Sequence, residues 1–396
     1  MQQLRQNKTS DKGNFVEQPQ RQEGLQIGAL EKANLLVRSF AAAVLSSINS
    51  PPQSDMADGL MTLAPGTRVS GRWIIIKKLG AGSFGAVYLC QDERVGTIAA
   101  LKTEPFNTRR PLLVMEATVL LNLNNLKPGI GLNFCRCLDL GRDEQQNATT
   151  GTTMPFNYVV MTLVGRPLDK LLREAGDRFS PGTTIGISIQ MLNAIKTLHK
   201  VGFLHRDVKP GNSAIGLVES NEQRLLYLID FGMARSYIRS DGQQRRPRAT
   251  SQFRGTPIYA PISAHTRRDY SRKDDVESWF YVMVKFFKGT LPWKHIAGGR
   301  DEIGEMKCRR LEGQPTEVRE KAINDLLGGC PPEFNLILEH IDALQLEDRP
   351  CYEMIELLLR GYLAQNNIEE HPYDWEIGRR NSDREKTQIE KPAEKQ

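Results

Sequence analysis

The chain has 396 residues, of which 39% are hydrophobic and 25% are charged. This composition supports a sizeable buried core and excludes a wholly disordered chain, while the length fits two or three ordinary domains or one large unit with tails. The 53 basic and 47 acidic residues leave a net charge of +6, a mild excess for which we expect no nucleic-acid partner.

The cysteines and the apolar runs indicate in which cellular compartment the protein is expected. The six cysteines form no C-x-x-C pair, so we expect neither a disulfide framework nor a zinc site. Cys135 and Cys137 are predicted to alternate on one face of a strand. The first 24 residues lack a secretory signal and the apolar run 40–45 is too short to span a bilayer. We therefore expect no membrane partner and a reducing compartment, the cytoplasm or also the nucleus.

Residues 1–65 are predicted to be a disordered extension, because their start is rich in Gln, Lys, Asp and Gly. Apolar residues at helical spacing predict a possible short helix at 27–48. Such a helix could be incidental, bind a partner or a membrane surface, or fold against the main domain. Its polar face is not strongly basic, which weighs against a membrane role. The globular part is expected at 66–376.

The first hundred residues of the globular part are predicted to form a sheet with one helix, because β-branched and aromatic runs alternate with glycines and turns. Residues 143–154 are interpreted as an insertion that forms a surface turn. The predicted strands are Trp73–Ile76, Ala86–Cys90, Ile98–Lys102, Phe134–Leu140 and Tyr158–Met161, and the predicted helix is Pro111–Leu123.

After Gly165 the apolar pattern becomes mostly helical, with one hairpin between Ala214 and Ile229. Strands first and helices later predict an α+β fold with two lobes, at about 66–164 and 165–376, and a cleft between them. Residues 377–396 are expected to be a charged, disordered tail. The predicted helices are Leu168–Ala175, Thr183–Lys200, Asp274–Phe287 and Met354–Leu363.

A glycine-rich stretch follows the first predicted strand. It reads Gly80-Ala81-Gly82-Ser83-Phe84-Gly85-Ala86-Val87 and matches G-x-G-x-x-G-x-V. A dinucleotide-binding fold uses similar glycines, and Glu104 lies where that fold has its ribose-binding acid. A β run follows Gly85, however, whereas the dinucleotide motif must open a helix. The stretch therefore predicts a strand–loop–strand lid whose backbone N–H groups approach the phosphates of ATP.

Two charged residues of the predicted small lobe fit the same chemistry. Lys102 ends the strand Ala100-Leu101-Lys102 and is expected to contact the α- and β-phosphates. Glu116, on the predicted helix, would hold that lysine by an ion pair. A lysine at a strand end is usually only solvated, so this interpretation depends on the motifs around it.

The stretch His205-Arg206-Asp207-Val208-Lys209-Pro210-Gly211-Asn212 and the later Asp230-Phe231-Gly232 supply the reacting groups. Asp207 is the candidate base that accepts the proton of an acceptor hydroxyl. Lys209 would neutralise charge on the γ-phosphate. Asn212 and Asp230 would hold Mg²⁺, a hard ion that prefers oxygen ligands.

Other residues of these stretches have plainer interpretations. His205 is predicted to be a packed structural histidine. Arg206 is expected either to meet a phosphate on the segment after Asp230 or to bond backbone carbonyls. Lys209 two residues after Asp207, with Thr256 further on, favours serine or threonine hydroxyls as acceptors over tyrosine.

In this order the motifs are those of a protein kinase, and residues 68–376 resemble the casein kinase 1 group, most closely its tau-tubulin kinase branch. The resemblance implies a bilobal kinase fold, ATP and Mg²⁺ as cofactors, and phosphorylation of serine or threonine in protein substrates, possibly acidic ones, by a monomer. The stretches that carry the branch resemblance are 133–136, 156–161, 201–207, 253–256, 291–293 and 372–376.

The resemblance also assigns individual positions. It implies that Met161 lies behind the adenine and that the backbone of Leu163 bonds the adenine. It implies that Asp275 anchors the loop of Asp207 and that Arg349 braces the large lobe. The expected ATP-binding set is Leu79, Gly80, Ala81, Gly82, Ser83, Phe84, Gly85, Val87, Ala100, Lys102, Glu116, Met161 and Leu163.

The chain departs from the family pattern on the substrate side. Ala260-Pro261-Ile262 lacks the glutamate that would pair with Arg349, and Ile258 stands where the group has an arginine that helps to bind acidic or phosphorylated substrates. Four arginines could replace it as a basic surface or be a solvated loop: Arg245, Arg246, Arg248 and Arg254. These departures keep open an alternative, a pseudokinase-like scaffold that binds nucleotide and protein partners without phosphoryl transfer.

Overall fold

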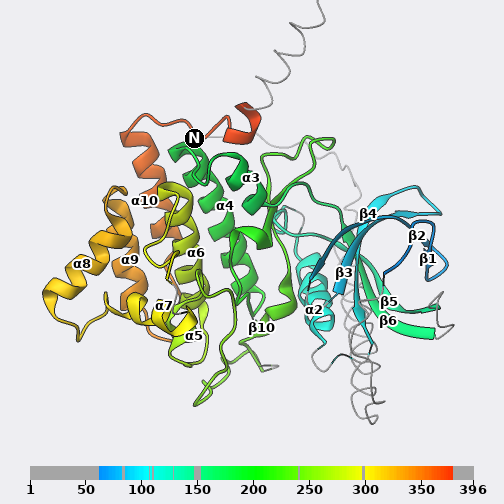
Figure 1. The fold of residues 1–396 in the computed structure, drawn as a ribbon, viewed down its shortest axis with the longest axis horizontal. Coiled ribbons are helices and arrows are strands. Elements are labelled where there is room, and N and C mark those ends of the chain that lie inside the picture. Colours follow the sequence, from blue (N-terminus) through cyan, green and yellow to red (C-terminus); the bar gives the residue numbers. More distant parts are fainter. Residues whose placement is uncertain are drawn as a thin grey trace, which may run out of the picture.

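The computed structural model describes residues 62–377 except 83–84, 107, 109–110, 128, 147–152, 240 and 297–298. The predicted helix at 27–48, nearly all of the N-terminal extension and residues 378–396 lie outside this part. The described chain forms two lobes, a sheet with helix α2 (Leu112–Asn124) and a larger, mainly helical part (Figure 1). The predicted α+β, bilobal fold is confirmed, whereas its exact boundaries stay predictions.

The small lobe is a six-stranded antiparallel sheet in the order β1-β2-β3-β4-β6-β5. Its strands form because buried and less buried residues alternate, as at Ala86, Tyr88 and Cys90, which point into one apolar cluster. The bounds are β1 (Arg68–Val69), β2 (Trp73–Gly82), β3 (Gly85–Asp92), β4 (Ile98–Pro105), β5 (Cys137–Gln146) and β6 (Thr153–Thr162).

Two predictions about β5 and β6 were wrong. The predicted surface turn at 143–154 is part of a long hairpin, in which Asp143 pairs with Phe156 and Gln146 with Thr153. Polar residues form this outer stretch because one face of the edge strand is exposed. The strand predicted from Phe134 begins only at Cys137, so Cys135 and Cys137 do not share a strand face.

Helix α2 is held at its N-terminus by a side chain from β4. The buried carboxylate of Glu104 accepts the backbone N–H groups of Leu112, at 2.8 Å, and of Leu113, at 3.3 Å. Such an acceptor satisfies N–H groups that the first turn of a helix leaves free. Burial raises the pKa of Glu104 to about 7, against the opposing effect of these two hydrogen bonds. The residue considered as a ribose-binding acid therefore fixes a helix.

The large lobe is built around α4 and α6, whose residues are buried on nearly all sides. The predicted hairpin is present as β8 with β9, and the four predicted helices correspond to α3, α4, α6 and α10. Helices α5, α7, α8 and α9 were not predicted. The helices are α3 (Leu168–Glu174), α4 (Pro181–Lys200), α5 (Ile262–His265), α6 (Arg272–Lys288), α7 (Gly299–Cys308), α8 (Thr316–Leu327), α9 (Glu333–Ala343) and α10 (Tyr352–Gln365).

Short strands and turns complete this lobe, and they carry the segments that contain Asp207 and Asp230. Among the described residues, no helix is both long and apolar enough to cross a bilayer. The short ladders are β7 (Phe203–Leu204) with β10 (Arg235–Ser236) and β8 (Ser213–Ile215) with β9 (Leu226–Leu228), and the 3₁₀ turns are Pro210–Asn212 and Phe231–Met233.

Candidate active site

A cavity of about 380 Å³ lies between the lobes, lined by the sheet, α2 and the loops around Asn212 and Asp230. Gly80 and Ala81 lie on β2 but do not line it, and Ser83 and Phe84 are outside the described residues. The predicted residues that line the cavity are Leu79, Gly82, Gly85, Val87, Ala100, Lys102, Glu116, Met161, Leu163, Asn212 and Asp230.

The glycine stretch lies between two paired strands, as predicted. Strands β2 and β3 pair up to Gly82 and Gly85, so strand follows loop and the helix of a dinucleotide fold is absent here. At Gly85 a Cβ atom would lie only 1.8 Å from the carbonyl oxygen of Thr103 on β4. A side chain cannot fit there, so glycine at this position lets β3 and β4 approach closely over the cavity.

Lys102 lies at the centre of an ion-pair network that joins the lobes. Its Nζ is 2.6 Å from Glu116 Oε2 on α2 and 3.0 Å from Asp230 Oδ1 of the large lobe. Burial lowers the pKa of Lys102, but the two carboxylates outweigh burial and raise it. Burial likewise works against the charge of Asp230, and Lys102 still holds the pKa of that carboxyl below its usual value. A cation is thus fixed on the wall of the cavity between the lobes.

Both carboxylate oxygens of Asp207 accept hydrogen bonds from neighbouring side chains. Lys209 Nζ donates to Asp207 Oδ2 at 2.6 Å and to Thr256 Oγ1 at 3.0 Å, and the Thr256 hydroxyl donates to Asp207 Oδ1 at 2.9 Å. Asn212 Nδ2 also reaches Asp207 Oδ2, at 3.1 Å. The side chain of Asp207 retains some exposure, so an acceptor hydroxyl can approach it. The structure thus brings Asp207, Lys209 and Thr256 into direct contact.

The residues present fit a magnesium ion. Asn212 uses its Nδ2 for Asp207, and among the described residues nothing donates to its amide oxygen, which can therefore face a metal. Asp230 offers a second oxygen ligand on the same cavity. Mg²⁺ in nucleotide sites commonly takes one or two protein oxygens and completes its shell with phosphate and water. Bound there, the ion would neutralise charge on the phosphates.

The loop that carries Asp207 is anchored from α6, as the resemblance implied. Asp275 accepts the backbone N–H of His205 at 2.7 Å and of Arg206 at 2.8 Å, and it contacts His199 Nε2 at 2.8 Å. His205 is buried against the ring of Phe231, with centroids 5.3 Å apart, which confirms its structural role.

Of the two interpretations of Arg206, the structure shows the second. Its Nε donates to Met233 O at 2.7 Å and its Nη2 donates to Ala234 O at 3.2 Å. Burial, together with the nearby Arg235 and Arg254, lowers the pKa of Arg206 to about 10. Arg206 therefore holds the segment after Asp230 through its backbone.

The brace of the large lobe differs from the expectation. Arg349 is about half exposed, and among the described residues its ion pair is with Glu353, in the first turn of α10, so its predicted bracing role was wrong. Instead, the buried Glu277 on α6 accepts the N–H of Ile262 at 3.1 Å and pairs with the buried Arg310 at 3.1 Å. Burial opposes the charge of Glu277, but Arg310 lowers the pKa of that carboxyl. The pair therefore replaces the contact that the missing glutamate would make.

Several residues of the cavity were not predicted. Ile229 precedes Asp230 and could have been found from that position alone, since the residue before a metal ligand is close to the same site. Val164 follows Leu163 and could have been found in the same way. The strand alternation that places Ala100 and Lys102 on one face of β4 gave a weak signal for Glu104. Cys135 and Leu112 carried no signal, because they reach the cavity through a turn and the start of α2. The full unpredicted set is Thr103, Glu104, Leu112, Leu113, Cys135, Thr162, Val164, Gly165, Gly211 and Ile229.

Comparison with known proteins agrees with this geometry. Residues 73–359 match the model of the protein kinase domain. The chain is 36% identical over 316 residues to a probable serine/threonine-protein kinase of Dictyostelium discoideum, covering 79% of this chain and 58% of the relative. It is 31% identical over 314 residues to the serine/threonine-protein kinase spe-6 of Caenorhabditis elegans, covering 78% of this chain and 76% of that relative. The chain therefore belongs to the protein kinase family, among its serine/threonine kinases.

Proposed function

We propose that this kinase transfers the γ-phosphate of Mg²⁺-ATP to serine or threonine hydroxyls of acidic proteins, as a member of the casein kinase 1 group close to its tau-tubulin kinase branch. The observation that carries the proposal is the contact of Asp207 with Lys209 and Thr256 beside the cavity. A base, a cation and a hydroxyl-bearing loop are together where an acceptor hydroxyl and a γ-phosphate would meet.

The proposed roles divide the site in two. Lys102 binds the α- and β-phosphates, Glu116 orients it, and Asn212 and Asp230 hold the metal. Asp207 orients the acceptor hydroxyl and takes its proton, while Lys209 stabilises charge on the phosphoryl group. Electrostatic positioning of this kind supplies most of the rate enhancement in phosphoryl transfer, because the chemistry needs little covalent help from the protein.

A preference for acidic substrates is supported by the exposed segment that contains residues 245–248. Arg245, Arg246 and Arg248 are exposed, and the nearby Asp269 is already paired with Arg235. Uncompensated guanidinium groups raise the local positive potential and attract acidic peptides. Because Ile258 has no charge, these arginines would carry the preference that an arginine at that position has in the group.

The test is phosphorylation of casein and of a peptide library by the full chain with Mg²⁺-ATP. Incorporation into serine and threonine peptides, with enrichment of acidic or phosphorylated flanking residues, is the expected result. Nucleotide binding by a cooperatively melting protein that modifies no peptide would favour the scaffold alternative. Phosphorylation without acidic enrichment would contradict only the substrate class.

We also propose that the kinase acts as a monomer in the cytoplasm, with the nucleus as a second site. All six cysteines are free, which suits a reducing compartment. Light scattering of the purified chain and microscopy of the tagged protein test these two statements separately.

A further inference from the structure

Lys307 on α7 is a buried lysine whose side chain points at backbone atoms of the segment 257–260. Only 1% of the residue is exposed. Its Nζ donates to Pro257 O at 2.9 Å, Ile258 O at 3.1 Å and Ala260 O at 2.6 Å. An ammonium group has three N–H donors, and here each donor has one carbonyl acceptor. The fit indicates a dedicated anchor, since a lysine is almost never fully buried without partners.

Burial and the contacts of Lys307 act in opposite directions on its charge, and the three carbonyl acceptors favour the charged form. Burial lowers the pKa of Lys307 well below its usual value, and Glu277 offsets this effect only in part. The ring centroids of Tyr281 and Trp293 lie 4.8 and 4.9 Å from Nζ, so two aromatic faces also stabilise the cation. The other polar groups facing it are Arg310 and His265, whose Nε2 is 3.4 Å away. A neutral amine would have two donors for three carbonyls and would leave one buried oxygen unsatisfied.

The anchored segment leads directly to the catalytic base. The carbonyl oxygen of Thr256 accepts the N–H groups of Tyr259, at 2.9 Å, and of Ala260, at 2.8 Å, so residues 256–260 form one hydrogen-bonded turn. The hydroxyl of Thr256 donates to Asp207. Lys307 therefore holds one side of a turn whose other side contacts the carboxylate that would receive the acceptor proton.

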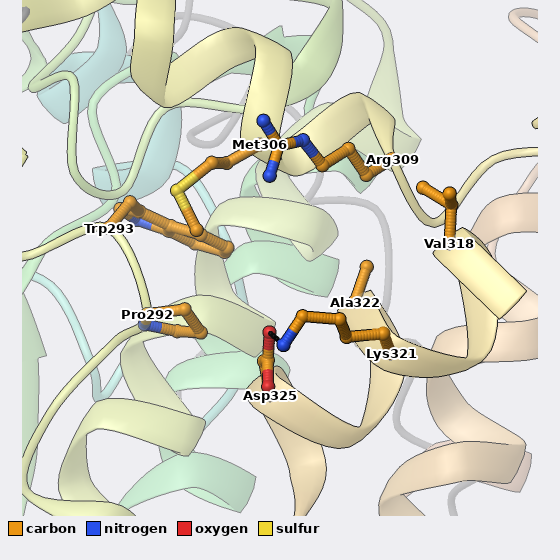
Figure 2. A pocket seen from close by; sticks show the side chains of 8 residues that line it. All are labelled: Pro292, Trp293, Met306, Arg309, Val318, Lys321, Ala322 and Asp325. Carbon is orange, nitrogen blue, oxygen red and sulfur yellow. Dashed lines mark ion pairs between the residues drawn. The ribbon is translucent and has the colours of Figure 1, made fainter.

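Trp293 adds a second donor to the same turn. Its Nε1 donates to Ile258 O at 2.8 Å, so this carbonyl accepts from both Trp293 and Lys307. Figure 2 shows Trp293 at the edge of a cavity of about 240 Å³, facing Met306 and Ala322 from α7 and α8. This side of the indole borders the cavity, so the ring is held from its other side. The contacts there are the hydrogen bond to Ile258 and the packing against Lys307 and Tyr281.

We propose that Lys307 is a positioning residue for the protein substrate: its ammonium group sets the path of residues 257–260, against which the substrate chain lies next to Asp207. The inference rests on the proposed function and adds a specific peptide-side element to it. Lys307 does not reach the nucleotide cavity, because the residues that line that cavity do not include it. Its loss should therefore affect the peptide and spare ATP.

The test compares Lys307→Met with Lys321→Met in the full chain. Methionine keeps much of the side-chain volume and removes the charge. Lys321 is a matched control, since it is an exposed lysine on the cavity in Figure 2, and its ion pair in the described part of the chain is with Asp325, at 3.5 Å. Loss of charged hydrogen bonds predicts a fall of about tenfold or more in kcat/KM for the peptide, chiefly through KM. The KM for ATP, and all constants of Lys321→Met, should stay within about twofold.

Unchanged peptide kinetics in a cooperatively melting Lys307→Met protein would overturn the inference. If that variant does not fold, Trp293→Phe decides the question, because it keeps a ring and removes one donor to Ile258. A rise of about threefold or more in peptide KM is then expected, and no change contradicts the inference. If the wild-type chain transfers no phosphate, the proposed function fails by itself. Amide hydrogen exchange of residues 256–262 then tests the anchor, with faster exchange expected in Lys307→Met alone.

Discussion

The nucleotide side and the proposed peptide side of the active site are held by different kinds of contact. On the nucleotide side, Lys102 forms ion pairs with Glu116 and Asp230, so residues from three sequence motifs contact one another. On the peptide side, Lys307 and Glu277 bind backbone atoms of residues 257–262. Side-chain pairs require particular residues at both ends and therefore leave motifs in the sequence. Contacts to the backbone require a particular residue at one end only.

The largest effect is expected at Asp207, where the two sides meet. Asp207→Asn removes the base but keeps a side chain that can bond Thr256 and Lys209. We expect kcat to fall by about 10²–10⁴, the range typical of general-base catalysis, with ATP affinity unchanged. Phosphotransfer and fluorescent-nucleotide titration measure the two quantities. Turnover near the wild-type value would remove Asp207 from this role.

The next effect concerns the brace of the peptide side. Arg310→Met leaves Glu277 and Asp342 without their buried cation, whereas Arg349→Met breaks an exposed pair. Breaking a buried pair from one side lowers the free energy of unfolding by about 3–5 kcal/mol. An exposed pair contributes about 0–1 kcal/mol. Chemical denaturation of both variants gives the comparison, and equal destabilisation would show that Arg310 is not the brace.

The smallest effect is a pH dependence on the nucleotide side. Burial raises the pKa of Glu104 from its ordinary range to about 7, so the folded state binds the proton more tightly than the unfolded chain does. The contribution of Glu104 to stability is therefore present below the unfolded pKa and is lost as the pH rises towards 7. Relative to wild type, Glu104→Gln should gain about 1–3 kcal/mol between pH 5 and pH 7. Denaturation midpoints at both pH values measure this gain, and parallel curves would contradict it.

Most of the fold was predictable where the apolar residues follow a single strand or helix periodicity. Strand β3 alternates strictly, and α4 and α6 carry long apolar patterns. The outer half of the β5–β6 hairpin was missed because its residues are polar and pair mainly through the backbone. Helices α7 and α8 were missed because they bury few residues and their exposed faces are strongly polar, which reads as loop.

The residues of the site that contact one another through side chains were predictable, whereas those that bind backbone atoms were not. Lys102, Glu116 and Asp230 were found from motif spacing, and the structure brings them together. Arg349 was assigned a bracing role by resemblance, but this chain lacks the glutamate that would be its partner. Arg310 replaces Arg349. This residue follows α7, a helix that was not predicted. Nothing in the sequence marks Lys307, because carbonyl oxygens carry no residue identity.

The contacts of Lys307 have a consequence for how the peptide side can diverge. All twenty amino acids carry a carbonyl oxygen, so the anchor does not depend on which side chains stand at positions 257, 258 and 260. Substitutions there can alter what the segment offers to an incoming chain while its path is retained. If the proposed role is correct, the side chains of this segment can change and alter substrate preference. The backbone contacts with Lys307 would still keep the segment in the same position relative to Asp207.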